Sequence, residues 1–140
     1  MQSTMIKLSV AIAAAMLLAG AAQAHDVATD GKEARAVLQA RQLADVANTK
    51  GMMLTVTYAP GQASNPHRHP GSVFAYVAEG EVISKLDDGP EVHYKAGDSW
   101  YESPGMRHVV SRNASDSMPA KLLVFLLLPD GAQVAEPLAK

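Results

Sequence analysis

The chain has 140 residues, of which 48% are hydrophobic and 19% charged, a composition that suits one globular domain with an apolar core. The net charge is −2 and no run of Lys and Arg occurs, which excludes a nucleic-acid-binding protein, since such proteins need a basic surface. The chain has no cysteine, which excludes thiol nucleophiles, disulfides and cysteine-ligated zinc.

The first 24 residues have the pattern of a secretory signal peptide. Lys7 is followed by the apolar run Leu8–Gly20 and then by Ala22-Gln23-Ala24, so a basic start, a short apolar segment and an A-x-A cleavage site occur in order. The apolar run, at about 13 residues, is shorter than the roughly 20 needed to span a bilayer. We therefore expect cleavage after Ala24 and a periplasmic or secreted protein without a membrane anchor.

The rest of the sequence is predicted to form short strands separated by turns. β-branched and aromatic residues recur in short runs, and clusters of Gly, Pro and Asp separate these runs. The expected strands are Ala36–Gln42, Met52–Tyr58, Val73–Ala78, Val82–Leu86, Val92–Lys95, Ser99–Glu102, Arg107–Ser111 and Leu122–Leu128. We expect one strand-rich domain over residues 36–135, preceded by an extension (25–35) and followed by a tail (136–140).

Two segments carry signals that compete with the strand prediction. The leucine-rich run Leu122–Leu128 could be helical by composition, but it is short and lies between Pro119 and Pro129, which favours a buried strand. A weak helical signal covers Gly31–Gln39. The succession of many short strands nevertheless predicts an all-β fold, an antiparallel sandwich or barrel.

The histidines are the residues most suggestive of chemistry. In an extended segment, side chains alternate between faces, so His67 and His69 would point to one side and Arg68 to the other. Two imidazoles at this spacing can hold one metal ion, although an H-x-H sequence also occurs by chance on many surfaces. His108 is the third candidate ligand, whereas His93, in an expected hairpin, is interpreted as a surface or packing residue.

Two separated motifs make the chain resemble the cupin superfamily. The first is Gly61, five residues, His67-Arg68-His69 and a closing Gly80; the second is Gly97, a strand, Pro104-Gly105-Met106-Arg107-His108 and then Asn113. Pro104 and Asn113 each lie one position away from the usual spacing. The motifs and their flanking strands cover roughly residues 36–130.

This resemblance implies a jelly-roll barrel with one divalent transition metal inside its mouth. The ligands would be the histidines that match the motifs, His67, His69 and His108. Three neutral imidazoles suit Fe, Mn, Ni, Cu or Zn and leave positions open for water or substrate.

The chain departs from the cupin motif at one ligand. The motif's glutamate would fall at Val73, and no acidic residue occurs between His69 and Glu79. Three interpretations follow: a metal centre with three histidines, a site in which Glu102 substitutes, or a site that holds no metal. Glu102 could act as a ligand, as a group that orients a ligand or water, or as a proton shuttle.

Strand parity predicts the character of the cavity wall. If Val73 faces inward, Ala75 and Val77 do so too, and the wall is apolar, which favours a small and partly apolar or aromatic ligand. The aromatic residues are expected to pack in the core or at the rim; these are Phe74, Tyr76, Trp100, Tyr101 and Phe125.

The resemblance implies three candidate functions. The first is a metal-dependent, dioxygenase-type enzyme that acts on a small enol, diketone or aromatic substrate, with Glu102 moving a proton. The second is a metal-assisted isomerase or decarboxylase, and the third is a periplasmic binding module without catalysis. Resemblance to cupins of this size also implies a homodimer.

Overall fold

The computed structural model describes residues 25–29 and 33–139. The predicted signal peptide, residues 1–24, lies outside the described residues. This part of the chain contains eleven strands and no helix, and hence no helix that is long and apolar enough to cross a membrane. The all-β prediction is confirmed.

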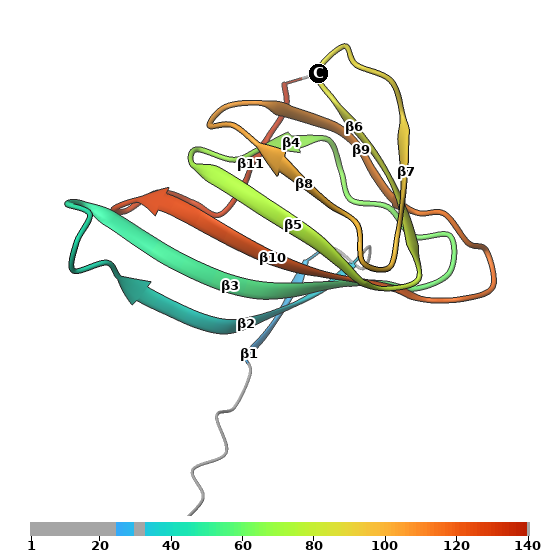
Figure 1. The fold of residues 1–140 in the computed structure, drawn as a ribbon, viewed down its shortest axis with the longest axis horizontal. Coiled ribbons are helices and arrows are strands. Elements are labelled where there is room, and N and C mark those ends of the chain that lie inside the picture. Colours follow the sequence, from blue (N-terminus) through green and yellow to red (C-terminus); the bar gives the residue numbers. More distant parts are fainter. Residues whose placement is uncertain (1–24, 30–32, 140) are drawn as a thin grey trace, which may run out of the picture.

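The strands form two antiparallel sheets that lie against each other (Figure 1). The six-stranded sheet has the order β1-β2-β3-β10-β5-β8, and the five-stranded sheet has the order β11-β4-β9-β6-β7. The strand bounds are β1 (His25–Thr29), β2 (Glu33–Gln42), β3 (Thr49–Tyr58), β4 (His67–Arg68), β5 (Ser72–Glu79), β6 (Glu81–Leu86), β7 (Val92–Lys95), β8 (Ser99–Glu102), β9 (Arg107–Asn113), β10 (Ala120–Pro129) and β11 (Glu136–Pro137).

The leucine-rich run is the central part of β10, as predicted. It pairs with β3 on one side and β5 on the other, and its even-numbered residues from Leu122 to Leu128 are buried. This alternation is that of a strand with one face in the core. The weak helical prediction for Gly31–Gln39 is wrong from residue 33 onward, where the structure describes the segment, because Glu33–Gln42 is a strand that pairs with β3.

Three short strands lie where the sequence predicted none. Residues 25–29 form β1, which pairs with β2. β4 carries His67 and pairs with β9, whereas β11, close to the end of the chain, pairs with β4. The segment near residue 136 therefore lies beside the first of the candidate histidines.

The corner between β4 and β5 packs directly on the backbone of β10. A Cβ atom built on Gly71 would lie 1.8 Å from the carbonyl oxygen of Leu127, so only glycine allows this approach. This close approach lies two residues after His69 in the sequence.

Asn113 joins the end of β9 to the end of β3. Its buried amide nitrogen donates hydrogen bonds to the carbonyl oxygens of Ala59 (3.1 Å) and Met118 (2.8 Å), and its oxygen accepts one from the Ser115 amide (2.9 Å). A single side chain thus satisfies backbone groups of two loops at one end of the barrel.

Candidate metal centre

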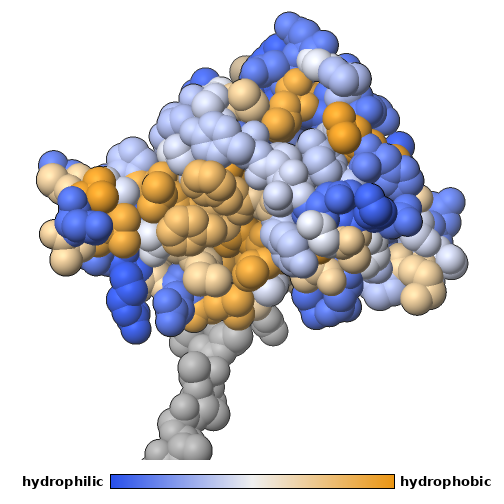
Figure 2. All heavy atoms as spheres, viewed as in Figure 1, coloured by the Kyte–Doolittle hydropathy of each residue, from blue (hydrophilic) through white to orange (hydrophobic). Residues whose placement is uncertain are grey.

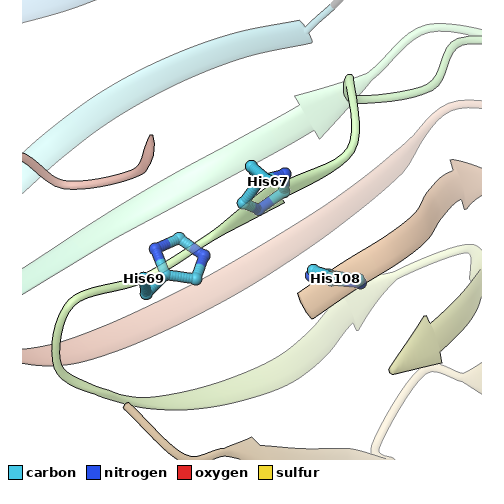
Figure 3. A group of neighbouring side chains, drawn as sticks. All are labelled: His67, His69 and His108. Atoms are coloured by element: carbon cyan, nitrogen blue, oxygen red, sulfur yellow. The ribbon is translucent and has the colours of Figure 1, made fainter. Parts of the chain in front are cut away.

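Three histidines from two parts of the chain meet inside the barrel (Figure 3). His67 lies on β4, His69 follows directly after it, and His108 lies on β9 with its Cα opposite that of His67. The ring centroid of His67 is 4.8 Å from that of His69 and 5.1 Å from that of His108. One nitrogen of each ring lies within 4.8 Å of the others, so the three side chains could hold a metal ion.

Backbone carbonyls orient two of the rings. Nδ1 of His67 lies 2.7 Å from the carbonyl oxygen of Asn65, and Nδ1 of His69 lies 2.6 Å from that of Val134. A carbonyl oxygen only accepts, so Nδ1 carries the hydrogen in both rings and Nε2 keeps a free lone pair. Metal-binding histidines are commonly held in this way.

Burial keeps both of these rings neutral. It lowers the pKa of His67 from 6.5 to about 4, and the hydrogen bond to Asn65 opposes this effect only in part. Burial also lowers the pKa of His69, against the opposing effects of Val134 and the Glu102 carboxylate. At neutral pH the Nε2 lone pairs are therefore available to a ligand.

His108 is held from both of its nitrogens. Nε2 lies 2.8 Å from the Ser84 hydroxyl, and Nδ1 lies 3.1 Å from Oε1 of Glu102. Ser84, His108 and Glu102 thus have the order of a nucleophile–base–acid triad. Ser84 is buried and does not line the cavity, however, so its hydroxyl positions the imidazole. No motif in the sequence pointed to Ser84.

Glu102 is the carboxylate of this site. It lies at the end of β8 with only 2% of its surface exposed. Oε1 accepts a hydrogen bond of 2.9 Å from the Trp100 indole. Among the described residues Oε2 has no hydrogen-bond partner, and it lies 3.8 Å from Nε2 of His69. Burial would raise the pKa of Glu102, but contacts with His108 and Trp100 lower it overall, so the carboxylate is ionised at neutral pH.

The cavity beside the histidines is mainly apolar. Its wall comes from β3, β5 and β10, and the predicted inward orientation of Val73 and Ala75 is confirmed, with Val77 buried on the same face. Arg35 is the only Lys or Arg among its described lining residues, and it pairs with the carboxylate of Glu33. The space inside it measures about 40 Å³, room for a few water molecules at roughly 10–15 Å³ each.

A cluster of hydroxyl groups lines the cavity as well. The Tyr58 hydroxyl lies 2.7 Å from that of Ser64 and 2.8 Å from that of Ser111. Tyr58 is buried, and burial raises its pKa although both serines oppose this effect. Tyr58 lies in a strand that the sequence predicts, but no sequence pattern indicates this cluster.

The other residues considered from the sequence lie outside the cavity, with one exception. His93 is exposed and pairs with Glu81 at 2.8 Å, which confirms its interpretation as a surface residue. Trp100 is buried and lines the cavity. The expectation of core or rim packing was wrong for Phe74, Tyr76 and Tyr101, which are about half exposed on the outer face of the six-stranded sheet.

Two antiparallel sheets around a cavity with an internal histidine cluster define a jelly-roll barrel of the kind that can hold a metal ion. Residues 54–126 match the family described as "Cupin domain", and the chain belongs to this family.

Several known proteins are similar to this chain in sequence or in fold. The chain is 28% identical over 122 residues to the tetracenomycin polyketide synthase protein TcmJ of Streptomyces glaucescens, covering 86% of this chain and 75% of TcmJ. It resembles the structure of an uncharacterized double-stranded β-helix protein from Klebsiella pneumoniae (27% identity, TM-score 0.59, 78% and 89% coverage). The polyketide cyclase RemF of Streptomyces resistomycificus, at 18% identity, shares the fold (TM-score 0.57, 79% and 73% coverage).

Proposed function

We propose that the protein is a metal-dependent enzyme that acts on a small enol, diketone or aromatic substrate. The observation that carries the proposal is the convergence of His67, His69 and His108 at one end of an apolar cavity. Three protein ligands leave coordination positions open, which is typical of catalytic rather than structural metal sites.

The residues present suit a divalent transition metal such as Fe, Mn, Ni, Cu or Zn. Two Nε2 atoms have free lone pairs on rings that carbonyls hold in place. A buried carboxylate oxygen without a hydrogen-bond partner lies beside them. When bound, such an ion would act as a Lewis acid toward a substrate oxygen and, if redox-active, would support chemistry with O₂.

The protein's own groups would bind and deprotonate the substrate. The wall that includes Val73 and Ala75 would pack against its apolar part and exclude water. Glu102 is ionised and buried, so its carboxylate can accept the proton of an enol or hydroxyl group, or the proton next to a ketone. Trp100 and His108 hold that carboxylate in place.

We propose a dioxygenase-type reaction as the leading candidate and an oxygen-independent reaction as the alternative. Neither metal-assisted isomerisation nor metal-assisted decarboxylation needs O₂. In an isomerisation Glu102 would take a proton from one carbon and return it to another; in a decarboxylation the protonated form of Glu102 would give a proton to the carbon that has lost CO₂. The similarity to a polyketide synthase protein supports ketone-rich, enolisable substrates for either reaction.

Metal analysis combined with a substrate screen tests this proposal. We expect about one transition-metal ion per chain in protein purified without chelator, and loss of that ion in His67→Ala and His108→Ala. His93→Ala is the control, because this exposed histidine lies outside the cluster. Enols and diketones would then be screened with an oxygen electrode and again without oxygen. Metal without turnover under either condition would favour a binding module, and absence of metal would overturn the proposal.

We also propose that the protein acts outside the cytoplasm after signal-peptide cleavage. The support is the pattern of Lys7, the apolar run and Ala22-Gln23-Ala24. Mass spectrometry of the protein from its native host should show a chain that begins at His25. An intact Met1 in the cytoplasmic fraction would contradict the proposal.

We further propose that the protein is a homodimer that pairs through the outer face of the six-stranded sheet. Figure 2 shows an apolar patch on this face, where Phe74 and Tyr101 are 50% and 47% exposed with their rings 5.1 Å apart. Phe74→Lys should convert a dimer to a monomer in sedimentation, whereas Met118→Lys, at an exposed apolar residue elsewhere, should not. A monomeric wild-type protein would contradict the proposal.

A further inference from the structure

We infer that Glu102 supplies a fourth protein ligand, through Oε2, to an ion held by the three histidines. This inference rests on the proposed metal centre and deepens it. An ion at Oε2 would leave neither oxygen free for proton transfer, because Oε1 is already engaged by Trp100 and His108, so the ligand role would replace the role of base in the proposed reaction. The carboxylate would come from β8, the strand next to the one that carries Val73, where the cupin motif has its glutamate.

The strand register places Glu102 beside the position that lacks an acid. β5 and β8 are antiparallel, and the Cα atom of Glu102 is directly opposite that of Val73. Residues that face each other in this way project to the same side of the sheet, with Cβ atoms roughly 5 Å apart. Both residues line the cavity. A side chain at 102 can therefore reach the same space as a side chain at 73.

The two oxygens of Glu102 have different surroundings. Oε1 accepts from Trp100 and contacts Nδ1 of His108. Oε2 is buried and has no hydrogen-bond partner among the described residues. A buried carboxylate oxygen that lacks a partner is costly, and a cation would supply the missing interaction.

The distances also suit a shared ion. Oε2 lies 3.8 Å from Nε2 of His69, the nitrogen of that ring with a free lone pair. Two ligand atoms bound at about 2.1 Å to one ion lie roughly 3.0–3.4 Å apart. Small side-chain rotations would bring the carboxylate and the imidazoles into one coordination sphere.

The competing role for Glu102 is that of a positioning residue that holds His108 and never touches the ion. A carboxylate at position 73 would separate the two roles. Such a group would start from β5, without the contacts that Glu102 makes to Trp100 and His108, so it could replace Glu102 as a ligand but not as the partner of His108.

The experiment compares wild-type protein with Glu102→Gln, the double variant Val73→Glu/Glu102→Gln, and Glu79→Gln. Glu79 is an exposed acid paired with Lys121, and its variant is the matched control. Metal-free proteins would be titrated with manganese(II) and cobalt(II) salts, and the visible absorption of bound cobalt would report its coordination. Circular dichroism would show that each variant is folded.

If Glu102 is a ligand, Glu102→Gln should weaken cobalt affinity at least about tenfold and change the cobalt spectrum. The double variant should recover most of the cobalt affinity and a spectrum close to that of wild-type protein. Glu79→Gln should match wild type in affinity and spectrum. An unchanged cobalt spectrum in Glu102→Gln would overturn the inference, whether or not the affinity falls. If the double variant does not fold, the spectrum of Glu102→Gln is sufficient to decide between the two roles. Failure of wild-type protein to bind either ion, or wild-type affinity in His67→Ala, would refute the metal centre itself.

Discussion

Acidification is expected to destabilise the metal-free protein through His67. The fold lowers the pKa of this ring to about 4, whereas the unfolded chain has the ordinary value of 6.5. Between these pH values the unfolded state binds more protons than the folded state. The free energy of unfolding should therefore be highest above pH 6.5, decrease as the pH falls from 6.5 to about 4, and level off below that as far as His67 is concerned.

The size of the effect follows from the two pKa values. At about 1.4 kcal/mol per pKa unit, the difference between 6.5 and about 4 corresponds to about 3 kcal/mol of stability. His69 contributes with the same sign, because its pKa is also lowered. The lowered pKa of Glu102 adds stability that is present above 4.5 and lost at lower pH, so it acts mainly below the window of the histidines.

Urea unfolding between pH 7.5 and 4.5, with a chelator present throughout, tests this expectation. His67→Asn removes the titrating ring but keeps a polar side chain. The free energy of unfolding of wild-type protein should fall more steeply with acid than that of the variant, by up to about 3 kcal/mol over the full window. If the two curves run parallel, burial does not control the protonation of His67 and does not keep its Nε2 unprotonated for a metal.

Three further substitutions test the contacts that shape the barrel. Tyr58→Phe removes hydrogen bonds to two serines and should lower the free energy of unfolding in urea by about 2 kcal/mol. The same substitution in a Ser111→Ala background should lower it much less, because Tyr58 and Ser111 are coupled. Fully additive losses would contradict this coupling. Gly71→Ala should lower the free energy of unfolding by about 3 kcal/mol or more, because its Cβ would meet a backbone oxygen. Gly105→Ala, at φ 78° with open space around it, should lower it by only about 1 kcal/mol. Equal losses in the two variants would refute the clash at Gly71. Asn113→Ala should cost about 3 kcal/mol, since backbone groups of two loops lose their partner, and a loss under about 0.5 kcal/mol would show that water replaces the amide.

The strand pattern of the fold could be predicted from the sequence because each strand has one buried face. In β10 and β5, buried residues alternate with less buried ones, and periodicity of this kind is local information. The short strands β4 and β11 could not be predicted in the same way. They have two residues each, too few for any period, and they exist because neighbouring strands supply hydrogen-bond partners.

Motif spacing predicts the histidine cluster, and Glu102 could also be named from the sequence, but two other groups that hold the rings could not. Ser84 and the carbonyl oxygen of Val134 position two of the rings, and both come from parts of the chain outside the two motifs. A serine in a strand or a backbone carbonyl in a loop has no sequence signature. Only the pairing of β6 with β9, and the return of the chain after β10 toward β4, brings these groups to the site.

The acid of the site shows why a motif with a missing residue can mislead. The motif places its acid by counting residues along the chain, and the residue found at that position is Val73. By this count the carboxylate is lost. In the sheet, however, Val73 and Glu102 are direct cross-strand neighbours and share one cavity wall. Exchange of an acid between two such positions changes the strand that supplies the group while leaving it close to the same histidines. In this chain the carboxylate nearest in space to the position of the missing acid is therefore found by its place in the sheet, because Glu102 is 29 residues from Val73 in sequence but opposite it across the strands.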